Sequence, residues 1–158
     1  MKESLRTGIT FGLTSAIITT LGLMVGLHSG THSRFIVLGG ILTIAIADAF
    51  SDALGIHISE ESENTHTIKE IWISTVATFL AKFLFALTFA VPVLLLSLST
   101  AIIVSLLWGM LILASLSYAM AKSQGTAPWK VVVEHILIAL VVVGITHLVG
   151  DWVATLSV

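Results

Sequence analysis

The sequence predicts an all-α integral membrane protein, a single domain with five transmembrane helices, and three observations support this. Hydrophobic residues make up 56% of the 158 residues and charged residues only 10%, with a mean hydropathy of +1.07, whereas a soluble domain carries about 25% charged residues. Five apolar stretches are long enough for a bilayer core, which needs roughly 20 residues per helix. Turn-forming residues separate most of them. A soluble fold of this size could not bury so much apolar surface, which excludes a disordered chain, a nucleic-acid binder and a cytosolic enzyme.

The first predicted span covers residues 5–27. It is long, rich in threonine and lacks a small-x-small cleavage site before the next span, so it is not a cleavable signal peptide. Four of its glycines have the small-xxx-small spacing that lets helices approach closely. These are the pairs Gly8 with Gly12 and Gly22 with Gly26.

The second span, residues 35–58, follows a short His-Ser-Gly-Thr break, and a longer Ser-Glu-rich run separates it from the third, residues 70–91. Pro92 stops the third span, but the residues after it stay apolar, which predicts a tight hairpin within the interface. The fourth span, residues 94–121, and the fifth, residues 129–153, are separated by a Gly-Thr-Ala-Pro turn.

Basic residues near the span ends predict the orientation, because cytoplasmic ends carry an excess of Lys and Arg. With the N-terminus inside, only Arg34 lies on the outer side. The inner side then holds five basic residues, namely Lys2, Arg6, Lys69, Lys122 and Lys130. We therefore expect a cytoplasmic N-terminus and an external C-terminus.

The second and third spans contain charges that hydrocarbon does not tolerate cheaply, so each is a functional hypothesis by default. Asp48 and Asp52 are four residues apart and share a helix face. Counted from the cytoplasmic ends at ~1.5 Å per residue, these acids, Lys82 and Ser15 all lie near mid-membrane. Asp48 and Lys82 match in depth and are expected to pair. With no cysteine in the chain, any metal must be held by oxygen, nitrogen or thioether.

An Asp48–Lys82 pair has two interpretations that the sequence leaves open, a structural link between helices or part of a site. Asp52 is harder to explain structurally, since two acids and one base leave an uncompensated charge. Such an acid takes up a proton or binds a cation. We therefore expect Asp52, Asp48 and Ser15 to hold a metal ion, and Lys82 with Asp48 to form a proton-coupling or charge pair.

Weaker candidates lie at the two membrane faces. His147 and Asp151, four apart on the fifth span, form either an exit relay or an ordinary hydrogen-bonded pair. The acids at the cytoplasmic mouth can attract divalent cations or simply cap solvated helix ends. They are Glu60, Glu61, Glu63 and Glu134. The methionines inside the spans, Met24, Met110 and Met120, are interpreted as packing residues.

Three segments resemble the vacuolar iron transporter and Ccc1-like family. They are GLTSAIITTLGLMVGL at 12–27, GGILTIAIADAFSDALGIHISEESE at 39–63 and AKSQGTAPWKVVVEHILIALVVVGITHLVG at 121–150. The family's first helix follows a G-x-x-D-G-x-x-T-x-x-G-L-x-x-G-L pattern, and its second carries A-x-S-M ahead of a Ser-Glu-rich end. A turn with Pro-Trp and an early Glu mark its last helix. The resemblance covers nearly the whole chain.

The resemblance implies a homodimer that exports Fe²⁺ or Mn²⁺ from the cytoplasm in exchange for protons, with no permanent cofactor. Ser15 stands where the family has Asp, Asp52 where it has Met, and His147 where it has Tyr. The long cytoplasmic metal-binding insert of some members is missing. Replacing a thioether with a carboxylate makes the site harder and favours Mn²⁺, Fe²⁺, Mg²⁺ or Ca²⁺.

Other functions stay open. They include a carrier for a different cation and a non-transporting membrane module, such as a metal sensor or a subunit of a complex. An intramembrane aspartyl protease is set aside, since Asp48 and Asp52 share one helix whereas such a dyad converges from two sides, and no enzymatic activity is expected. A prokaryotic plasma membrane is favoured over a vacuolar one.

Overall fold

The computed structural model describes residues 1–156, and this part of the chain is helical and contains no strand. Five helical rods are each long and apolar enough to cross a membrane, as the sequence predicts. Two of the rods are interrupted. The elements are α1 (Lys2–Thr31), α2 (Arg34–Thr43), the π-helix η1 (Ile44–Asp48), α3 (Ala49–Glu63), α4 (Ile68–Thr88), α5 (Ala90–Leu95), α6 (Leu98–Ser123) and α7 (Pro128–Thr155).

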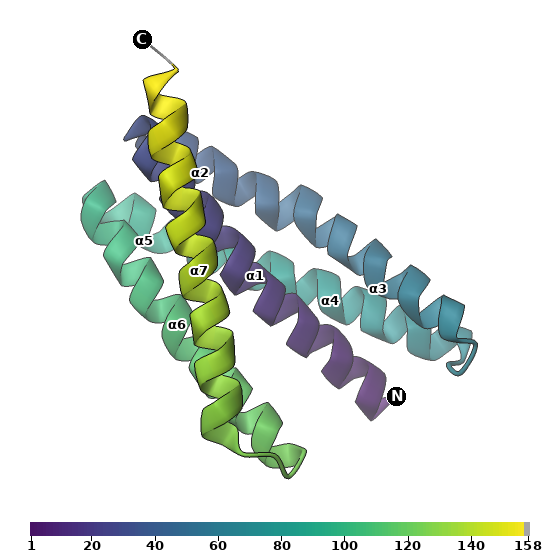
Figure 1. Ribbon diagram of the computed structural model, residues 1–158. Helices are drawn as coiled ribbons and strands as arrows, with labels where there is room; N and C mark the ends of the chain where they lie inside the picture. Colours follow the sequence, from purple (N-terminus) through teal and green to yellow (C-terminus); the bar gives the residue numbers. More distant parts are fainter. Residues whose placement is uncertain (157–158) are drawn as a thin grey trace.

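The rods alternate in direction, so their ends fall into two groups (Figure 1). The N-side holds the N-terminus, the α3–α4 turn and the α6–α7 turn, and the C-side holds the other turns and the end of α7. Helix α1 is central, packed against α4 on one flank and α7 on the other. Toward the N-side the α3–α4 and α6–α7 hairpins diverge, with α1 between them (Figure 1).

Four of the five rods extend beyond both ends of the predicted apolar spans because polar residues at their ends continue or cap them. The exception is the fourth, predicted at 94–121, because residues 94 and 95 belong to α5 and α6 begins at Leu98. Helix α4 begins at Ile68, where a capping box forms between Thr67 and Glu70. Helix α1 runs to Thr31 and α3 to Glu63, each followed by a left-handed residue, His32 or Asn64. Hydropathy alone therefore misses the polar residues at the ends of these rods.

Pro92 does not end the third span, contrary to the prediction. It lies within α5, and the chain reverses at Leu96 and Ser97 instead. Proline cannot donate to the carbonyl four residues earlier, which is that of Thr88, where α4 ends. The proline therefore interrupts the rod one turn upstream and leaves it long enough to span.

The predicted glycine contacts form, and they divide α1 into two packing zones. A side chain at Gly8 would meet the Ser74 carbonyl, and one at Gly12 would lie 2.6 Å from the Thr78 carbonyl, both on α4. Gly22 and Gly26 approach α7, where both meet Thr146. The close approach of α1 to α4 brings together two helices that carry buried polar side chains.

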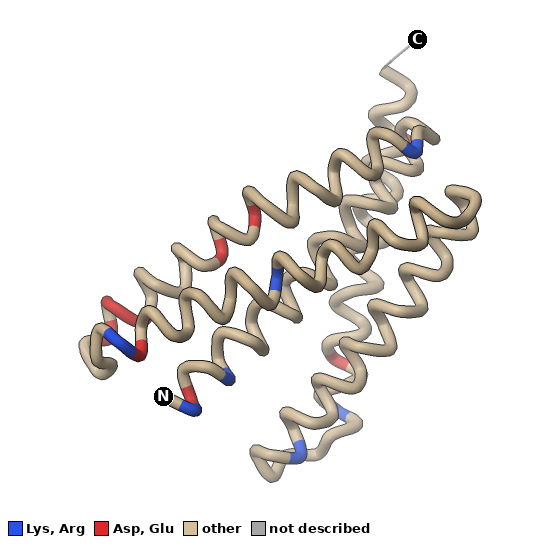
Figure 2. The backbone as a smooth tube through the Cα atoms, turned by 180° about the vertical axis from the view of Figure 1, so that it is seen from behind, with Lys and Arg blue, Asp and Glu red and all other residues tan. Residues whose placement is uncertain are grey.

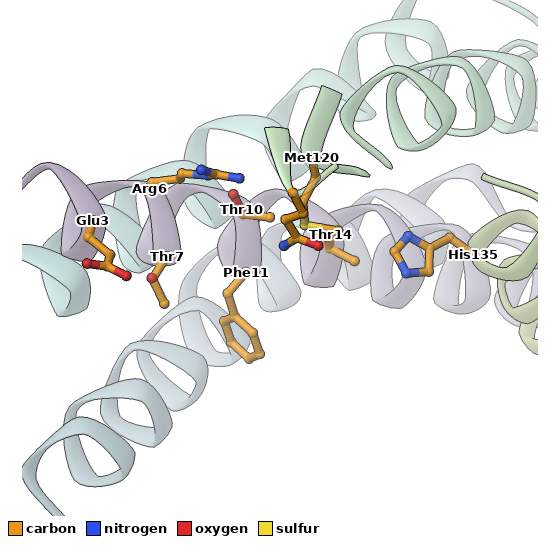
Figure 3. Close-up of a pocket in the computed structure, with 9 residues that line it drawn as sticks. Glu3, Arg6, Thr7, Thr10, Phe11, Thr14, Met120 and His135 are labelled. Atoms are coloured by element: carbon orange, nitrogen blue, oxygen red, sulfur yellow. The ribbon is translucent and has the colours of Figure 1, made fainter. Parts of the chain in front are cut away.

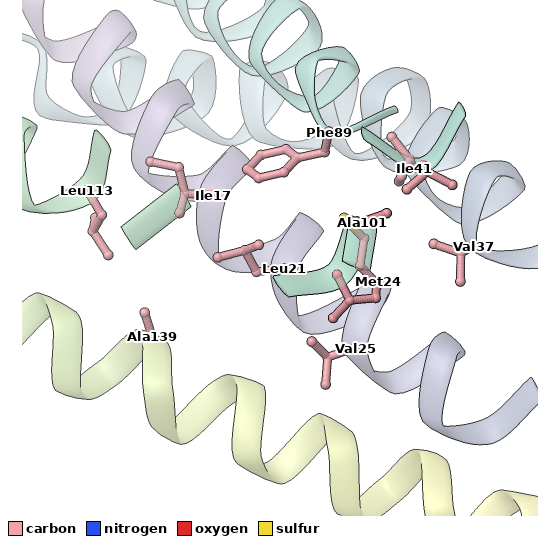
Figure 4. Close-up of a cluster of buried hydrophobic side chains, with 12 residues drawn as sticks. Ile17, Leu21, Met24, Val25, Val37, Ile41, Phe89, Ala101, Leu113 and Ala139 are labelled. Carbon is pink, nitrogen blue, oxygen red and sulfur yellow. The ribbon is translucent and has the colours of Figure 1, made fainter. Parts of the chain in front are cut away.

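The apolar core fills the C-side part of the bundle, where α1 meets α2, α5 and α6 (Figure 4). Met24 is a core residue and Met110 packs against the core, as predicted. Helix α7 contributes little to it, since only 6% of its most apolar window is buried. The buried polar side chains gather on the α1–α3–α4 side instead.

Candidate functional site

A π-helical segment precedes the acidic pair on the second rod. The rod changes from α2 to η1 at Ile44 and returns to α-helix at Ala49. Such single-turn π segments are frequent at functional sites. Figure 2 shows acidic positions along this rod facing a basic position on the neighbouring rod, away from either end.

Lys82 of α4 is the basic group, and it is completely buried. Its Nζ lies 2.5 Å from Asp48 Oδ2, 2.5 Å from Asp52 Oδ2 and 2.8 Å from Ser15 Oγ. The ammonium donates hydrogen bonds to Asp52 Oδ2 and Ser15 Oγ, whereas Asp48 Oδ2 is an ion-pair partner without hydrogen-bond geometry. The predicted Asp48–Lys82 pair forms, and the same cation also contacts the other two predicted site residues.

The cluster carries a formal charge of −1, because one ammonium faces two carboxylates. The Lys82 side chain is 0% exposed, whereas that of Asp52 is 19% exposed and that of Asp48 35%. Asp48 lines a hollow of about 500 Å³ on the outside of the bundle, with Thr19 and Ser51 beside it. The site is therefore closed on the α4 side and open on the α2–α3 side.

A line of polar groups extends from this cluster toward the N-side. Ser74, Thr78 and Lys82 are four residues apart on one face of α4, and all three are buried. Ser74 Oγ donates to Glu60 Oε2 at 2.5 Å. Since Glu60 is only 6% exposed, it faces the bundle interior.

Glu60 thus differs from the other acids predicted at the mouth. Glu61 and Glu63 are exposed at the end of α3, while Glu134 is exposed on α7, in the other hairpin. The four acids therefore do not all lie together, and their role as an entrance stays a prediction. The sequence held a usable signal, because Glu60 follows Asp52 by eight residues and so lies on the same helix face.

His147 and Asp151 pair on α7 near the C-side, with 3.6 Å between Nε2 and Oδ2. Ser29 of α1 contacts both residues, through the Asp151 carboxylate and, at 3.1 Å, the His147 carbonyl oxygen. Gly150 packs directly against α1 at the Gly26 carbonyl. The pair therefore belongs to the α1–α7 contact, whatever else it does.

A second polar cavity lies on the opposite flank of α1, where the α6–α7 hairpin diverges (Figure 3). Met120 lines it, although the sequence suggested a packing role for this residue. His135 also lines it, and it bonds Ser117 of α6 at 2.8 Å. No pattern in the sequence predicts that residues of α1, α6 and α7 line a common cavity here.

Among the described residues, no three His, Asp or Glu side chains form a preorganised metal site. The Lys82 cluster offers two carboxylates and one hydroxyl, and one oxygen of each group contacts the ammonium. These are hard oxygen ligands, the kind that suits Mn²⁺, Mg²⁺ and Ca²⁺.

No protein-family model matches this chain, and no curated protein matches its sequence. The chemistry of the cluster therefore carries the functional argument.

Proposed function

We propose that this protein is a secondary transporter that moves a divalent metal ion, Fe²⁺ or Mn²⁺, out of the cytoplasm in exchange for protons. The observation that carries the proposal is the charged cluster on three adjacent rods, where Lys82 meets Asp48, Asp52 and Ser15. Ionisable groups in a membrane-spanning bundle commonly mark ion pathways. The resemblance of the sequence to the vacuolar iron transporter and Ccc1-like family supports the same assignment.

In this proposal the carboxylates of Asp48 and Asp52 and the hydroxyl of Ser15 bind the metal, and Lys82 is the resident cation that it replaces. The negative charge left on the cluster favours a cation over a neutral substrate. Opposite charges already converge at one point, so a divalent ion needs only the ammonium to move aside. No permanent cofactor takes part.

The proposed assembly is a homodimer that covers the open side of the cluster. Asp48 is 35% exposed on the outside of the bundle, and a carboxylate facing lipid is costly. A second copy against the α2–α3 face would shield it and leave an aqueous path between the two clusters. Lysines and arginines at the N-side support a cytoplasmic position for that end.

The test is metal flux into proteoliposomes that hold a trapped pH dye. Wild type is expected to carry Mn²⁺ or Fe²⁺ with opposed proton movement, and Asp52→Asn to lower the metal flux by about tenfold or more. Glu63→Gln is the matched control, because its carboxylate lies in the same rod but is exposed. Wild-type flux in Asp52→Asn would refute the assigned site.

A non-transporting metal-sensing or assembly module is the second candidate, and the buried contacts of Lys82 favour it. An ammonium that pairs with two carboxylates and bonds a hydroxyl links three rods without any substrate. Metal binding to purified protein without flux in liposomes would select this candidate. Flux of another cation, with neither Mn²⁺ nor Fe²⁺ carried, would keep the carrier and change its substrate.

A further inference from the structure

The cavity between α1 and the diverging α6–α7 hairpin is separate from the Asp–Lys cluster. It has a volume of about 580 Å³ and lies along the N-terminal half of α1, between Glu3 and Thr14. Most of its lining residues carry a polar or sulfur-containing group, while apolar atoms form most of the lining surface. The lining residues are Glu3, Arg6, Thr7, Thr10, Phe11, Thr14, Met120, Gln124 and His135.

The hydrogen bonds of His135 fix which ring nitrogen is free. Ser117 Oγ lies 2.6 Å from the Leu113 carbonyl oxygen and donates its only hydrogen there. The 2.8 Å contact between Ser117 Oγ and His135 Nδ1 must then have the imidazole as donor. In the neutral ring this leaves Nε2 with its lone pair, and Figure 3 shows the ring directed from α7 toward Thr14 and Met120.

An imidazole held in this way resembles a metal ligand whose second nitrogen is fixed by an outer partner. Ligating histidines almost always donate the other ring N–H to such a partner, which sets both tautomer and orientation. Here Ser117 is the partner, and it is itself anchored to its own helix. Nε2 therefore needs no rearrangement of the ring before it binds a cation.

The cavity also supplies further ligands that the protein does not use. Met120 contributes a thioether, and Thr14 a hydroxyl. Within residues 1–156, the hydroxyls of Thr7, Thr10 and Thr14 make no hydrogen bond to protein. The formal charges of Glu3 and Arg6 in the lining cancel, so the lining does not favour an anion or a highly charged ligand.

We propose that this cavity binds one divalent cation of intermediate softness through His135 Nε2 and Met120 Sδ, with Thr14 and water completing the shell. Imidazole and thioether suit Fe²⁺ and neighbouring transition metals better than Mg²⁺ or Ca²⁺. The site differs in kind from the all-oxygen cluster on the other flank of α1. Any part of this site in metal transport rests on the proposed function, whereas the binding itself does not.

The experiment is a Co²⁺ titration of the protein in lipid nanodiscs, followed by visible absorption and by X-ray absorption at the cobalt edge. In the variant with both Asp48→Asn and Asp52→Asn, we expect one Co²⁺ per chain with nitrogen and sulfur in its shell. His135→Gln should raise Kd by about tenfold or more, and Ser117→Ala by about 10- to 100-fold. Met120→Leu should remove the sulfur signal.

His57→Gln is the matched control. His57 also bonds a hydroxyl, that of Thr75, at 3.0 Å, and Thr75 donates to its own helix at the Ile71 carbonyl. Its groove is lined by aromatic and aliphatic side chains and contains no methionine. Co²⁺ affinity is therefore expected to stay unchanged in this variant.

Unchanged Co²⁺ affinity in His135→Gln, or a shell without sulfur in the unmodified cavity, would overturn the proposal. If the double Asn variant does not fold, the loss of one bound Co²⁺ per chain from wild type to His135→Gln decides the same question. Cobalt bound at His135 in a protein that carries no metal flux would refute transport and keep this site. Metal flux in a protein that binds no cobalt at His135 would keep the transport function and refute this site.

Discussion

The Lys82 side chain lies inside the bundle with three oxygens around its Nζ. Removing one partner of a buried ion pair is far more damaging than replacing the whole pair, because the remaining charge stays without compensation. The cluster is therefore expected to behave as a unit. Its energetics can be measured without any assumption about transport.

Lys82→Met should lower the free energy of unfolding by about 3 kcal/mol, because it leaves two carboxylates facing each other. Adding Asp52→Asn to this variant should restore part of the loss, with a coupling energy of about 1 kcal/mol or more. Unfolding in mixed micelles of increasing denaturing detergent gives the numbers. Strictly additive effects would mean that the residues do not interact.

At the same scale, Glu60 shows what sequence reasoning missed. Counting residues from the end of a helix predicts the depth of each residue. This count correctly predicts that Ser15, Asp52 and Lys82 lie at a similar depth in the bundle. Which way a side chain faces depends on how the helices rotate against each other, and counting does not give that. Glu60 was consequently grouped with its exposed neighbours, although it is buried against Ser74.

Helix packing is the main determinant at the scale of the elements. Gly8 and Gly12 let α1 approach the backbone of α4, and Gly26 and Gly150 do the same for α1 and α7. The spacing of these glycines in the sequence was sufficient to predict close contacts. It was not sufficient to say which helix each pair contacts, since that depends on the fold.

Gly8→Ala should destabilise the protein, because the new methyl group would overlap the Ser74 carbonyl oxygen, a backbone atom that cannot easily move. Overpacking of this kind costs about 1–3 kcal/mol. Gly39→Ala is the matched control, because nothing lies within 4 Å of its would-be Cβ. It should gain up to about 1 kcal/mol from helix propensity. Equal effects at both positions would contradict this packing.

Pro92 illustrates an element that sequence reasoning interpreted incorrectly. A proline removes one backbone donor, but the rest of the rod can continue after a short irregular turn. Here α4 and α5 remain one spanning unit from Ile68 to Leu95. The physical reason is that residues on both sides of the interruption stay apolar and pack against neighbours.

At the scale of the whole molecule, five spans and one all-helical domain were predictable from hydropathy. The divergence of the two N-side hairpins and the cavity it creates were not. They arise from the angles at which helices cross, and those angles depend on contacts between residues distant in sequence. The proposed dimer is a property at this scale as well.

A single cysteine can test the dimer cleanly, because the chain has none of its own. Ser51→Cys lies beside the hollow at Asp48 and should form a disulfide between two copies under mild oxidation in membranes. Leu107→Cys on the exposed side of α6 is the control and should stay monomeric on the gel. Cross-linking at Leu107 alone would place the contact on a different face.

Orientation can be checked with the same background. Glu61→Cys at the N-side and Phe35→Cys at the C-side are both exposed positions. In intact cells, an impermeant maleimide should label Phe35→Cys and spare Glu61→Cys, as the excess of basic residues at the N-side predicts. The opposite labelling would invert the direction of transport proposed above.

Helix α1 separates the two polar regions, and consecutive residues on it belong to different ones. Ser15 bonds Lys82 in the charged cluster, while Thr14 lines the cavity on the other flank. Neighbouring residues on an α-helix point about 100° apart. A rotation of α1 about its own axis would therefore move both hydroxyls at once. As the Ser15 hydroxyl left Lys82, the Thr14 hydroxyl would change its position in the cavity. The backbone of α1 therefore links the two regions mechanically.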